Sequence, residues 1–312
     1  MRRRPARPLK AFGPGKVILL GEHAVVYGTT ALAVPLALGV RAEAVRAESC
    51  SLRLPSGLRG PRRQQLEEAF SLAADACGRP AVHLSLYSTL PMSMGLGSSA
   101  AVSVAVAGVL LQAATGKLPS ASRLRAVAHG MEVLFHGTPS GVDDACSALG
   151  VPIRFSRRGA SQAPLVRPLK LSRPFELLVA LAGERRPTLD TVAGLRRRQA
   201  VWPLRYRRLF AEVGRVAEEG ARSAEAGDLE GLGDAMNVNQ GLLVALGVSS
   251  PALDGMAAWL RESGALGAKL SGAGGDGGAV VGLFEKGKAQ KARRQLARTG
   301  VRCFVSPVPR QP

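Results

Sequence analysis

The sequence is poor in aromatic residues and in cysteine, and each shortage narrows the possible functions. Phe, Trp and Tyr make up 4% of the 312 residues, which leaves few side chains on which nucleic-acid bases could stack. Cys50, Cys77, Cys146 and Cys303 are widely spaced and contain no CxxC pair. We therefore expect reduced, mostly buried thiols, as in a cytosolic protein.

Targeting and membrane signals are also missing. The first ten residues, MRRRPARPLK, are basic, but no apolar segment of the secretory type follows them. No run approaches the roughly 20 apolar residues of a membrane span. We therefore predict a cytoplasmic protein with no membrane partner, and we treat residues 1–10 as a solvated basic arm.

The familiar nucleotide-binding signatures are absent as well. The sequence contains no G-x-x-x-x-G-K-[ST] segment. It also lacks the glycine loop, HRD and DFG set of protein kinases. Classical P-loop enzymes and protein kinases are thereby excluded, although two other glycine-rich turns remain.

What is present is a long, basic chain with ample apolar content. Hydrophobic residues make up 46% of it, rich in Ala, Val, Leu and Gly, which suits an α/β or α+β enzyme of one large or two ordinary domains. The formal net charge of +19 comes mostly from arginine. Such a balance favours anionic partners, nucleotides or nucleic acid, although a general preference for arginine in the genome would produce the same charge.

The first glycine-rich turn lies at 91–100, PMSMGLGSSA, and a long apolar run follows it. We predict a loop that leads into a buried helix. Gly95 and Gly97 allow positive φ, and the first turn of the helix offers free N–H groups to a phosphate. Ser98 and Ser99 could cap the helix or reach a metal ion on the phosphates. A plain turn that caps a core helix is the alternative.

The second glycine-rich turn is KLSGAGGDGGAVVGLF, residues 269–284. It contains more glycines than a hairpin requires, and a main-chain cradle for phosphate would account for them. A flexible loop is the alternative.

Hydrophobic periodicity and turn residues give the remaining elements. Glu132 falls near the end of one predicted helix, where the helix dipole disfavours a carboxylate, so it needs a cation or open water. A domain boundary is predicted at 168–174. The predicted strands are 16–20, 31–40, 41–54, 82–87, 175–182 and 301–305, with a strand–turn–strand at 268–284; the predicted helices run from 61 to 77, from 98 to 115, from about 120 to 135, and over 195–226, 229–246, 251–263 and 287–299.

Three segments in order, PGKVILLGEHAVVYG, PMSMGLGSSAA and KLSGAGGDGG, resemble the GHMP small-molecule kinase family, and the resemblance covers residues 11–308. Within that family, GEHAVVYG and HGTPSGVD are similar to the mevalonate kinases. The resemblance implies a two-domain α+β fold, the GHMP kinase fold. Its N-terminal domain, 11–168, would be like domain 2 of ribosomal protein S5. Its C-terminal domain, 169–312, would be ferredoxin-like, with the site in the cleft between the two.

The resemblance further implies transfer of the γ-phosphoryl group of ATP to the primary hydroxyl of mevalonate, with Mg²⁺. Asp143 matches the catalytic aspartate, which accepts or orients the hydroxyl proton, and Lys16 matches the lysine that neighbours it. Taken without the family, Asp143 could equally cap a helix and Lys16 could be a surface residue.

Ser99 and Glu132 match the two protein ligands to Mg²⁺, a hydroxyl and a carboxylate that suit a hard cation. His23 matches a substrate-contacting histidine, and Glu22 beside it would orient His23 or Lys16. Thr188 aligns loosely with a threonine near the substrate. The residues matched to ATP binding are Pro91, Met94, Gly95, Leu96, Gly97, Ser98, Ser99, Ala100, Gly272, Ala273, Gly274 and Gly275.

Two positions depart from the family pattern. Asp144 stands where relatives usually have Asn, and we expect it to face away from the site, because neighbours on a helix point about 100° apart. Asp276 replaces a glycine and would repel phosphates unless it turns outward.

A catalytically inactive regulator is disfavoured, because no matched active-site residue is missing, and two other alternative functions remain open. One is another GHMP kinase that acts on a related hydroxy acid or a sugar. The other is nucleic-acid binding by an S5-like domain, which the charge favours but which leaves Lys16, Ser99, Glu132 and Asp143 unexplained. We expect a small-molecule substrate, no nucleic-acid partner and a possible homodimer.

Overall fold

The structure is a computed structural model that describes residues 8–54, 57–91, 94–157, 162–183 and 188–310, without the side chains of 188–190. The chain forms two compact units, each assembled from segments that are distant in sequence. The strands β1 (Leu9–Leu20) and β2 (Thr30–Arg46) contribute residues to both units. The first unit holds Met1–Gly15, Leu38–Met92 and Gly97–Gly150, and the second holds Lys16–Ala37, Ser93–Leu96 and Val151–Pro312. These units do not divide at one position, and the predicted limits at residues 10 and 168 stay a prediction.

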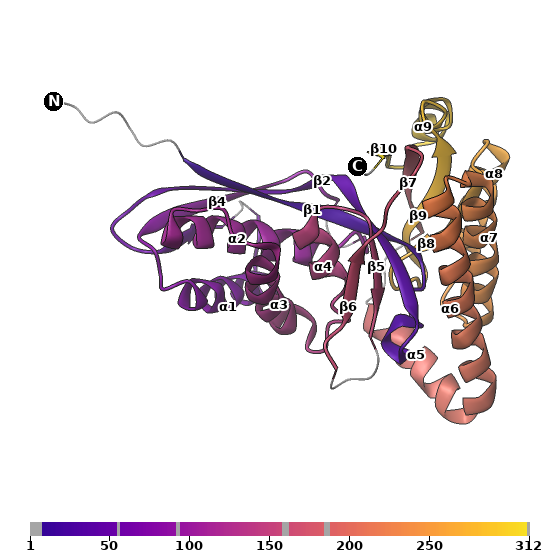
Figure 1. Cartoon of the computed structure of the whole chain (residues 1–312), viewed down its shortest axis with the longest axis horizontal. Helices are drawn as coiled ribbons and strands as arrows, with labels where there is room; N and C mark the ends of the chain where they lie inside the picture. Colours follow the sequence, from indigo (N-terminus) through magenta and orange to yellow (C-terminus); the bar gives the residue numbers. More distant parts are fainter. Residues whose placement is uncertain (1–7, 55–56, 92–93, 158–161, 184–187, 311–312) are drawn as a thin grey trace. The chain divides into compact units, whose positions relative to one another are not determined.

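The first unit places four helices on one side of its strands (Figure 1). The second half of β2 pairs antiparallel with β4 (Val82–Ser88), and β3 (Ser51–Arg53) pairs parallel with β4. Helix α3 packs against α1, α2 and α4. The helices are α1 (Pro61–Ala76), α2 (Ser98–Thr115), α3 (Ala121–His136) and α4 (Val142–Leu149).

Helix α2 is the core helix of the first unit. It begins after Gly97, whose φ of 69° only glycine adopts without strain. Strand β1 passes so close that a Cβ on Gly13 would lie 2.1 Å from the carbonyl oxygen of Ala101. By length and composition α2 could cross a membrane, but 61% of it is buried inside the structure, as expected for a core helix.

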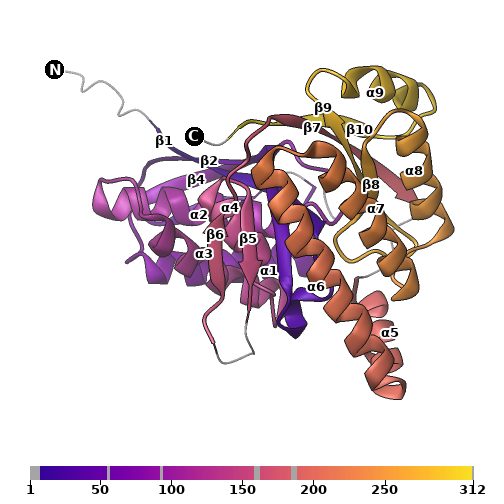
Figure 2. The same cartoon turned by 45° about the vertical axis from the view of Figure 1, so that its right-hand side comes forward.

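The second unit contains a four-stranded antiparallel sheet in the order β10-β7-β9-β8. Helices α7 and α8 pack against this sheet and α6 packs against α7, an arrangement visible in Figure 2. The strands are β7 (Phe175–Gly183), β8 (Gly267–Ser271), β9 (Gly277–Glu285) and β10 (Cys303–Val308); the helices are α5 (Thr188–Val201), α6 (Pro203–Ala226), α7 (Leu229–Ala245), α8 (Pro251–Glu262) and α9 (Ala289–Arg298).

A smaller group of strands completes the second unit. A short 3-10 helix, η1 (Val25–Tyr27), separates β1 from β2. The first half of β2 pairs antiparallel with β5 (Ile153–Ser156), which pairs antiparallel with β6 (Leu165–Pro168).

Most predicted elements are confirmed, including the helix after the first glycine turn and the strand–turn–strand at 268–284. The strand predicted at 41–54 has the wrong limits, because β2 runs from Thr30 to Arg46 without a break and only β3, Ser51–Arg53, is a separate strand in this range. The single helix predicted at 195–226 is also wrong. Pro203 cannot donate within a helix, and it instead begins a new helix, α6. Strands β5 and β6 were not predicted, because each has only four residues and carries an arginine.

The four cysteines, all within the described residues, form no disulfide bond, as predicted. Cys77 and Cys146 are buried, whereas Cys50 and Cys303 are partly exposed. The prediction that most of the thiols are buried therefore holds for only two of them.

Candidate functional site

In the first unit, α2 and α3 bring together two residues that the sequence assigned to one metal site. The Ser99 hydroxyl donates to Oε2 of Glu132 at 3.2 Å, and Ser103, one turn along α2, donates to Oε1 at 3.1 Å. Ser99 does not cap its helix, because Gly97 occupies the cap position. The hydroxyl and carboxylate oxygens therefore lie side by side near the start of α2.

Glu132 is an unusual carboxyl group, since it is only 1% exposed and lies near the end of α3. The pKa of Glu132 is raised to about 8, chiefly by burial and also by the charge of Asp143, while the hydrogen bonds from Ser103 and Ser99 oppose part of this rise. A nearby cation would strongly favour the ionised form of a carboxyl group that is buried in this way. The hydroxyl of Ser99 and the carboxyl of Glu132 suit Mg²⁺, which favours a few protein oxygens together with phosphate oxygens.

His136 belongs to the same cluster, although no role was predicted for it from the sequence. Its Nε2 lies 2.9 Å from the Ser99 hydroxyl and 3.7 Å from Oε2 of Glu132. The spacing from Glu132 to His136 is four residues on α3, which places both on one face, and this spacing is the signal that could have revealed the contact.

Asp143 and Asp144 occupy the first turn of α4 and have different surroundings. Asp144 is 1% exposed and faces α3, where its Oδ2 lies 3.2 Å from Nδ1 of His129 and 3.5 Å from Nε of Arg125. Burial raises the pKa of Asp144, and the charges of His129 and Arg125 lower it in part. Asp143 is half-buried and acts electrostatically on Glu132. Asp143 is not the helix cap, because Gly141 is.

In the second unit, Lys16 is not a surface lysine. It is 3% exposed, its N–H donates to the carbonyl of Leu96 at 2.9 Å, and its Nζ lies 3.4 Å from the carbonyl oxygen of Gly95. Two members of the predicted phosphate loop are thus bonded to the predicted catalytic lysine.

Glu22 is part of a buried ion pair that the sequence did not predict. Its carboxylate is bonded to Nζ of Lys269, a lysine with 0% exposure on β8, and accepts from Asn239 of α7 at 3.2 Å. Lys269 also donates to the carbonyl of Ile18. Burial lowers the pKa of Lys269, as does the charge of Lys16, and the charge of Glu22 opposes this. Lys269 and Asn239 are partners that the sequence did not predict for Glu22, and its predicted role of orienting His23 or Lys16 stays a prediction.

We expect Lys269→Met to destabilise the protein by about 3–5 kcal/mol, because it leaves the Glu22 carboxylate buried without a counter-charge. The double variant Lys269→Met with Glu22→Gln should recover much of this loss, since neither charge then remains. Urea denaturation of both variants measures the difference. If the single and double variants lose the same free energy of unfolding, Lys269 stabilises the protein by packing and not by its charge.

His23 has a rare backbone conformation for a residue with a side chain, with φ of 62°. Burial lowers its pKa to about 4, and hydrogen bonds with the backbone of Ala273 and Gly272 oppose the shift. Its Nε2 is buried and has no hydrogen-bond partner. A neutral ring with an unused nitrogen is suited to a polar substrate group.

The second glycine turn follows β8 directly. The Ser271 hydroxyl at its start accepts from the N–H of Ile18 at 2.8 Å. A Cβ on Gly274, whose φ is 68°, would lie 1.9 Å from the carbonyl oxygen of Val248, so only glycine fits there. Asp276 is exposed. The side chain of Thr188 lies outside the described part of the structure, so its predicted place near the substrate stays a prediction.

Comparison with known proteins identifies the family of this chain. The family model described as GHMP kinases N terminal domain matches residues 64–150, and the one described as GHMP kinases C terminal matches 220–302. A relative from Aeropyrum pernix is 34% identical over 97% of this chain and 96% of its own length. The chain therefore belongs to the GHMP kinases, as its motifs predicted.

That relative is named mevalonate kinase, and so is one from Pyrococcus furiosus that is 31% identical over 86% of each chain. The solved L. major mevalonate kinase in complex with R-mevalonate has a TM-score of 0.86, with 25% identity and 99% of each chain covered. Lactococcus lactis galactokinase complexed with galactose, at 16% identity and a TM-score of 0.72, shares the fold alone. The predicted two-domain α+β fold is confirmed.

Proposed function

We propose that this protein transfers the γ-phosphoryl group of ATP to the primary hydroxyl of mevalonate, giving 5-phosphomevalonate. The observation that carries the chemistry is the hydroxyl–carboxyl pair of Ser99 and Glu132 with Asp143 acting electrostatically on it. The choice of substrate is supported by the mevalonate kinase relatives at 31% and 34% identity.

Enzymes catalyse phosphoryl transfer mainly by positioning the reactants and stabilising charge, and little covalent catalysis by the protein is needed. In our proposal Asp143 accepts or orients the proton of the attacking hydroxyl, and the buried ammonium of Lys16 stabilises charge during transfer. The N–H groups at the start of α2 and the glycine turn at 272–275 hold phosphate oxygens, because free amides and a helix N-terminus attract anions. His23 contacts the substrate through its neutral ring.

Ser99 and Glu132 are the residues that would hold Mg²⁺. Mg²⁺ is usually bound through one or two protein ligands together with phosphate oxygens and waters, so this hydroxyl and this carboxylate would suffice. When bound, Mg²⁺ supplies charge neutralisation to the transferred group. We place the reaction in the cytoplasm, with ATP and mevalonate as the partners.

A coupled assay of ADP release tests this function. The purified protein is given ATP and Mg²⁺ with mevalonate, phosphomevalonate, homoserine or galactose, one at a time. We expect mevalonate to have the highest kcat/KM of the four. A higher value for another acceptor would keep the kinase activity but contradict the substrate, and no ADP release with any of them would contradict both.

A further inference from the structure

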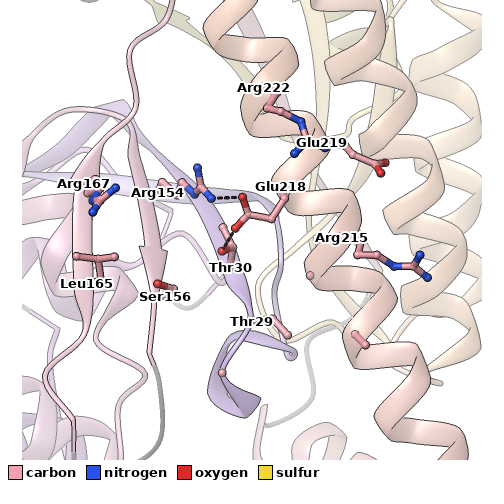
Figure 3. A pocket seen from close by; sticks show the side chains of 13 residues that line it. Thr29, Thr30, Arg154, Ser156, Leu165, Arg167, Arg215, Glu218, Glu219 and Arg222 are labelled. Atoms are coloured by element: carbon pink, nitrogen blue, oxygen red, sulfur yellow. Dashed lines mark hydrogen bonds and ion pairs between the residues drawn. The ribbon is translucent and has the colours of Figure 1, made fainter.

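A cavity of about 720 Å³ in the second unit contains none of the residues assigned to the kinase site. Figure 3 shows it between α6 on one side and the start of β2 with strands β5 and β6 on the other. Its lining residues are Gly28, Thr29, Thr30, Arg154, Ser156, Leu165, Arg167, Ala211, Gly214, Arg215, Glu218, Glu219 and Arg222. Four arginines against two glutamates make the lining cationic.

One of the two glutamates, Glu218, already has partners within the protein. Glu218 is bonded to the Thr30 hydroxyl and to the guanidinium of Arg154 (Figure 3). Burial raises the pKa of Glu218, but those hydrogen bonds and the charges of Arg154 and Arg222 outweigh it and hold the pKa below its ordinary value. Glu218 is therefore ionised at neutral pH and balances one guanidinium.

Of the four arginines, Arg154 pairs with Glu218 and Arg215 pairs with Glu212, whereas Arg167 and Arg222 form no ion pair within the described residues. Arg167 lies directly opposite Arg154 in the register of β5 and β6, and opposed residues on neighbouring strands extend on the same face. Ser156 and Leu165, the next opposed pair on that face, also line the cavity. Like charges in this position destabilise a sheet, and Glu218 bonds only to Arg154 of the two.

We propose that this cavity binds the phosphate group of a small organic molecule, with Arg167 as the principal anchor. A guanidinium presents paired donors that match a phosphate, and an anion between Arg154 and Arg167 removes their repulsion. The Thr29 hydroxyl is buried without a hydrogen-bond partner and adds a donor to the lining. Leu165, Ala211 and Gly214 give the cavity an apolar part, and its volume exceeds that of phosphate alone.

Isothermal titration with glycerol 3-phosphate tests the proposal, at low ionic strength and with saturating ADP and Mg²⁺ so that the nucleotide site is filled. The variants are Arg167→Gln and the control Arg208→Gln, an exposed arginine of α6 that does not line the cavity. We expect at least tenfold weaker binding for Arg167→Gln and wild-type affinity for Arg208→Gln. Inorganic phosphate should bind the wild type more weakly than glycerol 3-phosphate.

The melting temperature shows whether Arg167→Gln weakens ligand binding directly or by destabilising the fold. Without ligand, Arg167→Gln should melt at the same temperature as the wild type or higher, because a like-charge contact is removed. Its kcat for the proposed kinase reaction should be unchanged, so failure of that reaction and failure of this proposal are distinguishable. No binding to the wild type, equal binding to all three proteins, or tighter binding of inorganic phosphate would overturn the proposal.

Discussion

Asp143→Asn is expected to lower kcat by about 10²- to 10⁴-fold while the fold stays intact, the range typical for loss of a general base. The substitution keeps the shape of the side chain but cannot accept the hydroxyl proton. The charge of Asp143 raises the pKa of Glu132, so its removal eases ionisation of the proposed metal ligand. The loss should therefore persist at saturating Mg²⁺, which separates proton transfer from metal binding.

The control for this variant is Asp75→Asn, an exposed aspartate of α1 that pairs with Arg79. Its turnover should equal that of the wild type, because surface ion pairs contribute little. Circular dichroism and urea denaturation of both variants establish that each is folded. Near-normal turnover of Asp143→Asn would remove Asp143 from its proposed role.

The sequence predicts site residues best where a residue type is unusual for its place in the chain. Glu132 stands out in the sequence because a carboxylate at the end of a helix is unfavourable, and in the structure Ser99 and Ser103 bond to it. Gly95 and Gly97 stand out because their turn needs positive φ, and their φ values are 77° and 69°. These features are local, so the residues themselves contain the information.

The sequence was uninformative where a partner comes from a distant segment. Lys269 lies in an apolar strand 247 positions from Glu22, and Asn239 lies on a helix with no marked polar pattern. No spacing rule joins residues that far apart, because only the tertiary fold brings them together. The pairing of Arg154 with Arg167 could not be predicted either. The two arginines belong to β5 and β6, and strands of four residues are too short for hydrophobic periodicity to reveal them.

Glu132→Gln is expected to abolish most of the kinase activity and yet to stabilise the metal-free protein at alkaline pH. The Glu132 pKa is about 8 in the folded protein against 4.5 for the free side chain. Between these values the folded state keeps a proton that the unfolded state has released. The free energy of unfolding of the wild type therefore falls as pH rises, on the order of 1 kcal/mol per pH unit from this group.

The variant cannot titrate at this position, so its stability relative to the wild type should rise from pH 5 to pH 8 and then level off. Urea denaturation across this range in EDTA measures the difference, with Glu67→Gln, an exposed glutamate of α1, as a control that should follow the wild type. Addition of Mg²⁺ and ADP should stabilise the wild type most at high pH and the Glu132→Gln variant far less. A difference between the two proteins that does not change with pH would mean that the Glu132 carboxyl is already ionised at neutral pH, and the cation would then not be what compensates its burial.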